Sequence, residues 1–230
     1  MDAIRHALIV VMTLVPACAS ADGLIRTLPK DGAWVSYHGT LKGGSTEQSG
    51  KLILRSVGKV VENNQPLRWI ELDMVDPTRD GGGRTIYKML IAEKELKAGV
   101  DPVDHIVRAW IKQGKDDAKQ IADPSTLDRG FVGLYLHGPV EKEKQLSPIR
   151  EFLYQRGKLT GRARVGRRKI NLKNLKGTLD STVWPHKDVP FGVAGLQVIF
   201  GTEDNPKAIH VEFMVNDFGT DAKSALPDAN

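Results

Sequence analysis

Apolar and polar residues alternate one by one along four segments in the first half of the chain. Alternation with a period of two is typical of a strand with one buried face. The connections between the segments are short and polar, which favours antiparallel neighbours, because parallel strands would need long crossover connections. We therefore expect an antiparallel meander, with a bulge or bend at Gly58 in its second strand. The four segments are residues 33–41, 51–62, 67–75 and 84–92.

The apolar spacing changes to a helical period after residue 101. Asp101 is suited to cap a helix, and Pro102 fits the first helical position. The apolar residues that follow recur at i, i+3, i+4, i+7 and i+8; they are Val103, Ile106, Val107, Trp110 and Ile111. This pattern predicts an amphipathic helix over residues 102–112, packed by its apolar stripe against the meander.

A second, shorter helix is expected over residues 148–156. Ser147 and Pro148 provide a start signal of the same kind, and Gly157 follows the end. Its apolar stripe consists of Ile149, Phe152 and Leu153.

Strand patterns return in the last third of the chain. We expect a hairpin that turns near Gly166 and Arg167, followed by strands over residues 177–184, 195–202 and 208–215. The last of these alternates cleanly, with four apolar residues on one face: Ile209, Val211, Phe213 and Val215. The fold class predicted is mainly β (α+β), with a single domain over residues 22–218 and a flexible tail over 219–230.

The N-terminus has the pattern of a secretory signal peptide. A short segment with Arg5 precedes about ten apolar residues, and small residues then offer A-x-A cleavage sites, which places the signal peptide at residues 1–21. Cys18, the one cysteine of the chain, allows two interpretations. It is either removed with the signal peptide, or it is the lipidated first residue of a lipoprotein. Both predict export to the periplasm or beyond, and no later segment is long and apolar enough to span a membrane.

The positive charge of the chain is concentrated in residues 156–176. The whole chain carries a net charge of +5, and this stretch has nine lysines and arginines without an acidic residue. One interpretation is a solvated strand pair whose charges discourage aggregation. The other is a patch for anionic envelope surfaces or polymers, carried by Arg162, Arg164, Arg167, Arg168 and Lys169. Nucleic acid is not expected as a partner, because the stretch offers no aromatic residue for stacking on bases.

The sequence shows no recognisable catalytic or metal-binding motif. There is no G-x-S-x-G nucleophile elbow, and "GRARVGRR" lacks the Lys-Ser/Thr pair of a phosphate-binding loop. The histidines lack the spacing of a metal pair. Asp73, Asp76 and Asp80 lack calcium-loop spacing and are interpreted as turn formers. We therefore predict a protein without a cofactor or metal that is not an enzyme.

Two segments resemble a known group of proteins. "VWPHKDVPFGVAGLQVIF" and "YKMLIAEKELKAGVDPVDHIVRAW" are similar to segments of uncharacterised exported bacterial proteins related to the periplasmic lipoprotein-carrier group. The resemblance implies a half-barrel, a curved antiparallel sheet wrapped on one or two helices. Members of the carrier group hold acyl chains between sheet and helix. We predict an exported, non-enzymatic envelope protein that binds a lipid-like or amphiphilic ligand in an apolar concavity. The candidate lining residues are Tyr37, Trp69, Trp110, Trp184 and Phe191.

Overall fold

The computed structural model describes residues 23–44, 46–76, 83–124, 127, 142–172, 175–202, 205 and 209–226. The predicted signal peptide, Cys18 and residues 227–230 lie outside these ranges.

The described residues form one antiparallel sheet of eleven strands. The strands are β1 (Trp34–Gly43), β2 (Thr46–Glu62), β3 (Gln65–Asp76), β4 (Gly83–Ala92), β5 (Ile106–Gln113), β6 (Lys119–Ile121), β7 (Lys142–Tyr154), β8 (Gly157–Leu172), β9 (Leu175–Pro185), β10 (Val193–Gly201) and β11 (Ile209–Gly219). Short 3-10 helices also lie between strands in the described ranges: η1 (Glu93–Glu95), η2 (Pro102–His105) and η4 (Pro190–Gly192). The predicted mainly β, antiparallel class is confirmed.

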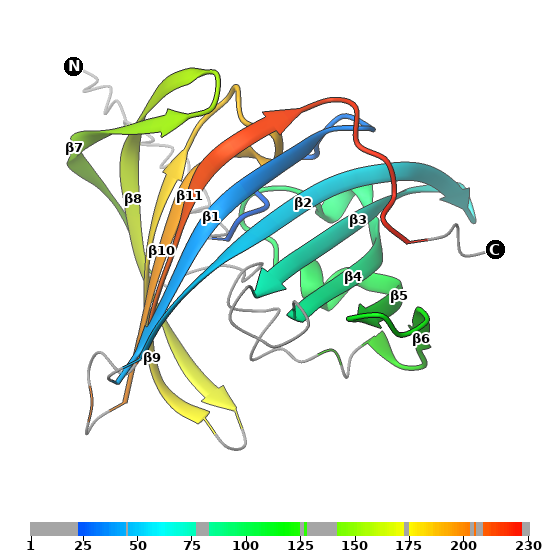
Figure 1. Cartoon of the computed structure of the whole chain (residues 1–230), viewed down its shortest axis with the longest axis horizontal. Helices are drawn as coiled ribbons and strands as arrows, with labels where there is room; N and C mark the ends of the chain where they lie inside the picture. Colours follow the sequence, from blue (N-terminus) through cyan, green and yellow to red (C-terminus); the bar gives the residue numbers. More distant parts are fainter. Residues whose placement is uncertain are drawn as a thin grey trace, which may run out of the picture.

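The sheet consists of two meanders that meet in its middle (Figure 1). The chain starts at the centre with β1 and steps outward, strand by strand, to β6 at one edge. It resumes at the opposite edge with β7 and returns to the centre, where β11 pairs with β1. The sheet remains open, with β6 and β7 at its edges.

The first meander agrees with the sequence pattern. Strands β1 to β4 pair in chain order, as expected. The register of β2 against β3 shifts between Ser56 and Lys59, around Gly58, whose φ of 125° suits only glycine. Asn63 and Asn64 both have positive φ and join β2 to β3 in a two-residue turn, a conformation that asparagine tolerates.

The predicted helix over residues 102–112 is wrong. Its start signals act locally, because Asp101 accepts a hydrogen bond from the Val103 N–H at 3.0 Å and Pro102 opens η2. The chain then continues as strand β5, paired with β4 and β6. The apolar side chains of this segment lie on both faces of the sheet. Ile111 packs on the main core, whereas Trp110 packs on the opposite face of the sheet. A strand with apolar residues on both faces can imitate a helical period.

The predicted helix over residues 148–156 is also wrong, because residues 142–154 form β7. Its expected stripe is divided between two faces: Phe152 is buried, while Ile149 and Leu153 point to solvent.

The predicted basic hairpin that turns near Gly166 and Arg167 is also wrong. Residues 157–172 form the continuous strand β8, which passes through Gly166 and Arg167 without turning and pairs with β7 and β9.

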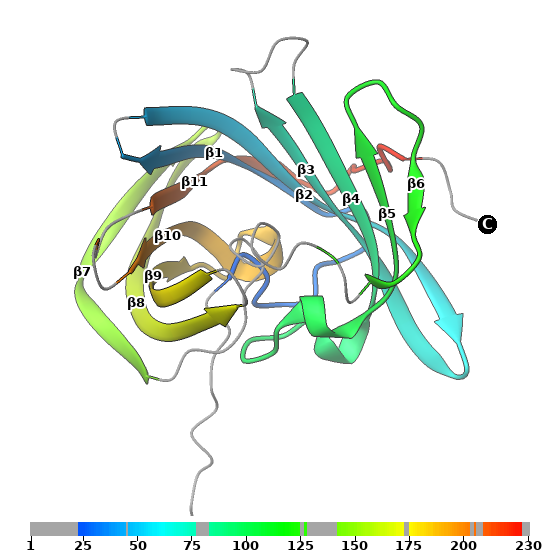
Figure 2. The ribbon, with the colours of Figure 1, turned by 90° about the horizontal axis from the view of Figure 1, so that it is seen from below.

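Loop segments, rather than a helix, complete the main core among the described residues. Leu24 and Ile25 near the start of the chain are buried, as is Phe191 in η4, and the Arg26 N–H donates to the Phe191 carbonyl at 2.8 Å. Figure 2 shows this early segment and the coil between β9 and β10 between the two wings of the sheet. We call the face of the sheet toward them the inner face. The expectation of a sheet wrapped on one or two helices is therefore wrong.

The C-terminal segment runs along the other, outer face. The Ala222 N–H donates to the Gly32 carbonyl at 2.8 Å, and Leu226 is buried. Ser224 and Ala225, part of the predicted tail, contact strands β3 and β4 through Lys88 and Glu71.

Candidate functional site

The inner face contains a hollow of about 450 Å³ at one end of strands β1 to β4 and β11. Ligand pockets typically range from about 300 to 1,000 Å³, so a single small amphiphile would fit. Residues that share the inner face by strand register contribute most of its lining. They are Gly39, Leu41, Gln48, Gly50, Leu52, Met74, Thr85, Tyr87, Gln113, Val211 and Phe213.

Two glycines explain why the sheet is hollowed here. Gly39 of β1 lies directly opposite Gly50 of β2, so neither strand places a side chain at this point of the inner face. The ring of Phe213 covers Gly39: a Cβ atom at Gly39 would lie 2.4 Å from Cε1 of that ring. Any larger residue at position 39 would displace the ring and change the wall of the hollow.

The polar groups on the inner-face side of the hollow are neutral. Gln48 and Gln113 are exposed and Thr85 is half-buried, whereas Leu52, Tyr87 and Phe213 are buried and apolar. Lys51, which is exposed, also borders the hollow. An apolar floor with a polar border suits an amphiphilic molecule whose polar end stays near solvent.

Three of the five predicted lining residues belong to the main core instead. The Tyr37 hydroxyl donates to the Val193 carbonyl at 3.0 Å, and burial raises the pKa of this phenol. Phe191 is fully buried, with a φ of 68° that non-glycine residues rarely adopt. The Trp184 ring packs edge-on against Phe152 at 5.7 Å and lies under Arg150.

The other two predicted lining residues lie on the outer face. The rings of Trp69 and Trp110 meet edge-to-face, with centroids 5.3 Å apart, in a small cluster separate from the main core. Lys88 and Arg108 approach the Trp69 ring at 5.5 and 5.8 Å. The structure therefore does not bring the five aromatic residues together, and none of them borders the hollow described above.

The predicted anion-binding residues follow one another along β8. Arg162, Arg167 and Lys169 are exposed, and Arg164 is half-buried; the side chain of Arg168 lies outside the described set. Arg167 forms a two-point contact with Asp180 of β9, with Nε–Oδ1 and Nη2–Oδ2 distances of 2.6 and 2.9 Å. Hydrogen bonds and charge from Asp180 raise the pKa of Arg167. Part of the positive charge is thus neutralised within the protein.

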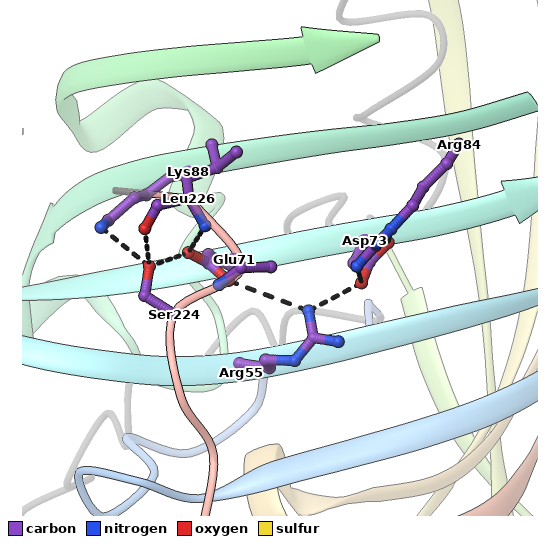
Figure 3. A network of polar contacts seen from close by, with 8 residues as sticks. Arg55, Glu71, Asp73, Arg84, Lys88, Ser224 and Leu226 are labelled. Atoms are coloured by element: carbon purple, nitrogen blue, oxygen red, sulfur yellow. Dashed lines mark hydrogen bonds and ion pairs between the residues drawn. The ribbon is translucent and has the colours of Figure 1, made fainter. Parts of the chain in front are cut away.

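The sequence patterns do not predict a network of charged side chains on the outer face, which surrounds the buried carboxylates of Glu71 and Asp73 (Figure 3). Arg84 donates from Nε and Nη2 to the two carboxylate oxygens of Asp73 at 2.9 and 2.8 Å. Arg55 Nη1 lies 2.8 Å from Asp73 Oδ2 and 3.8 Å from Glu71 Oε2. Burial by itself would raise the pKa of Asp73, but hydrogen bonds and charge from Arg84 and Arg55 outweigh it and lower this pKa.

The C-terminal segment completes this network. The Ser224 hydroxyl donates to the Glu71 carboxylate and accepts from Lys88 Nζ at 3.0 Å, while the Ala225 N–H donates to Glu71 Oε2 at 2.9 Å. The hydroxyl therefore bridges the Lys88 and Glu71 side chains. We interpret the network as structural. The sequence pattern that could have indicated this network is the placement of charged residues at alternate positions, such as Glu71 and Asp73 on β3.

The described residues hold neither a metal-binding cluster nor a membrane-spanning helix. No group of three or more His, Cys, Asp or Glu side chains there is placed to hold a metal ion. None of the helices found in those ranges has the length and apolar character needed to cross a membrane.

Comparison with known proteins defines no family for this chain. No model of a protein family matches the sequence, and no curated protein does so either. Solved structures that resemble the fold include the following two. One is a candidate lipoprotein from Parabacteroides distasonis, 8% identical, with a TM-score of 0.41 over 86% of this chain and 100% of that one. The other is a candidate exported protein with a YmcC-like fold from Bacteroides fragilis, 7% identical, with a TM-score of 0.41 over 85% and 99%.

These values carry no conclusion about activity. The likeness is one of structure, and the relationship to the lipoprotein-carrier group suggested by the sequence is not found at the level of a sequence family.

Proposed function

We propose that this chain is an exported, non-enzymatic protein of the cell envelope that binds a lipid-like or amphiphilic molecule in the inner-face hollow. The observation that supports the proposal is the hollow itself: about 450 Å³, with a floor of Leu52, Tyr87 and Phe213 and a polar border that includes Gln48, Gln113 and Lys51. Export rests on the signal-peptide pattern of residues 1–21.

The position of the hollow favours an amphiphile over a fully apolar ligand. It lies at one end of strands β1 to β5, where Gln48 of β2 and Gln113 of β5 are exposed. A bound acyl chain would cover the apolar floor, and its polar end would remain hydrated beside these amides. Burial of each methylene contributes about 0.8 kcal/mol, so a chain of moderate length is sufficient for micromolar affinity.

The test is titration of the delipidated chain, without residues 1–21, with a fluorescent fatty acid. Saturable binding with a stoichiometry near one is expected. Absence of saturable binding at micromolar protein would remove the proposal.

Two adjacent substitutions on β2 locate the binding. Gln48 shares the inner face with Leu41 and borders the hollow, whereas Glu47 is directed to the other face and pairs with Lys42 at 3.1 Å. Gln48→Trp should occupy part of the hollow and weaken binding about tenfold, or 1.4 kcal/mol. Glu47→Trp should leave the affinity unchanged, since exposed ion pairs contribute little. If both substitutions lower the affinity by the same factor, the ligand binds outside the hollow.

An alternative function is docking on anionic envelope surfaces through β8. The concentration of positive charge supports it, but the pairing of Arg167 with Asp180 reduces the charge that is available. Binding of this kind should weaken steeply as salt is raised, whereas binding in the hollow should respond little.

A further inference from the structure

The outward-facing side of the β7–β8 hairpin exposes two large apolar residues. Ile149 and Leu153 are 62% and 76% exposed, although their neighbour Phe152 is buried. The two are four residues apart on one strand and share a face, so they project in the same direction about 13 Å apart. We name this surface the hairpin face; it consists of Ile149, Glu151, Leu153, Lys158, Thr160 and Arg162, all exposed.

Basic residues lie directly opposite both apolar side chains. In the register of the hairpin, Arg162 is the partner of Ile149, and Lys158 is the partner of Leu153. Lys158 also pairs with Glu151 at 2.9 Å. The row of cations continues along β8 to Arg164. The hairpin face thus alternates protruding apolar groups with cations.

The opposite side of the hairpin is fixed to the rest of the molecule. The Gln155 N–H donates to the Asn216 carbonyl of β11 at 3.0 Å, and Arg156 Nη2 lies 2.8 Å from Asp217 Oδ1. Arg150 Nη1 lies 3.1 Å from Glu212 Oε1. These contacts keep Phe152 inward and therefore hold Ile149 and Leu153 in their outward position.

We propose that the hairpin face docks this protein on the surface of an anionic phospholipid membrane. Ile149 and Leu153 enter the boundary between headgroups and acyl chains, and Lys158 and Arg162 contact lipid phosphates. Two protruding side chains are too little for a stable protein interface, which usually buries at least about 1,000 Å² in total. They are sufficient for interfacial membrane contact, because cations beside them add attraction to anionic headgroups. This inference is independent of ligand binding in the hollow.

The experiment measures co-sedimentation of the chain without residues 1–21 with vesicles of phosphatidylglycerol and phosphatidylcholine. Binding should rise with the phosphatidylglycerol fraction and fall as salt is raised. Ile149→Ser combined with Leu153→Ser should lower the partition coefficient at least about tenfold. Arg162→Glu should lower it about fivefold or more and reduce its dependence on salt.

The matched control combines Val61→Ser with Val107→Ser, since these residues are 64% and 47% exposed on β2 and β5 of the other wing. This control should bind like the unaltered chain. All of the altered residues are exposed, so thermal melting should show each variant folded. Gln48→Trp should also keep vesicle binding, which separates docking from uptake of lipid into the hollow.

Three outcomes would overturn the proposal. The unaltered chain could fail to bind phosphatidylglycerol vesicles, or the hairpin-face variants could bind as well as the control. Sedimentation velocity could also show a dimer that Leu153→Ser dissociates, in which case the face would bind a second copy of the chain.

Discussion

Asp73 illustrates how burial changes the meaning of a single residue. In the sequence it belongs to a group of acidic residues around a glycine-rich loop, and this setting predicts a turn former. In the structure it lies within β3, buried, between Arg55 and Arg84. Its partners are 18 residues before and 11 residues after it in the chain, and only strand pairing brings them together.

Replacing this carboxylate should therefore be costly. Asp73→Asn leaves Arg55 and Arg84 without their anion and should lower the free energy of unfolding by about 3 kcal/mol at pH 7. Urea denaturation monitored by tryptophan fluorescence measures this change. Asp180→Asn removes the exposed partner of Arg167 and should cost less than about 1 kcal/mol. Equal costs would contradict the structural role of the buried network.

The lowered pKa of Asp73 also fixes the sign of a pH effect. A carboxyl group whose pKa is lower in the folded state stabilises that state above its unfolded pKa, about 3.9, and this stabilisation is lost as the pH falls further. The difference in unfolding free energy between the unaltered chain and Asp73→Asn should thus narrow below about pH 4. A constant difference down to pH 2 would show that ionisation of Asp73 does not stabilise the fold.

At the scale of elements, apolar residues on both faces explain the two wrong helix predictions. In β5, Ala109 and Trp110 pack on opposite faces, and in β7 the buried Phe152 stands beside the exposed Ile149 and Leu153. Strands of this kind lack the simple alternation that identifies β1 to β4. The start signals at Asp101 and Pro102 were interpreted correctly, but a cap fixes where a turn begins and not how far a helix continues.

The C-terminal segment should stabilise the sheet through Ser224. Ser224→Ala removes the hydroxyl between Lys88 and Glu71 and should lower the free energy of unfolding by about 1–2 kcal/mol. Lys223→Ala, an exposed change one residue earlier, should alter it by less than about 0.5 kcal/mol. Chemical denaturation of both variants provides the measurement. If Ser224→Ala has the same free energy of unfolding as the unaltered chain, the segment covers Glu71 without stabilising the folded state.

At the scale of the whole molecule, the pairing of β1 with β11 joins the two meanders. The main core contains Tyr37, Leu72 and Met89 from one meander and Val183, Leu196 and Phe213 from the other. We therefore expect that neither meander alone can bury its inner face, and the single domain stays a prediction.

Separate expression of residues 22–121 and 142–230 tests this dependence. Each fragment alone should lack the dispersed amide spectrum of a folded protein, because half of the core is missing. Co-expression should restore a folded complex. A fragment that folds by itself, with slowly exchanging amides, would show that the chain contains two domains instead of one.

The sequence by itself determined the strand segments of the first meander, the bulge at Gly58, the antiparallel class and the concentration of positive charge in residues 156–176. These features depend on neighbours within a few residues, where alternation and turn chemistry act directly. Only the tertiary structure decided that β11 lies beside β1, that Arg55, Arg84 and Ser224 surround the acidic pair, and that Gly39 faces Gly50 to leave a hollow. Each of these depends on which strands become neighbours and in what register, and contacts between distant segments leave no periodic signal in the sequence.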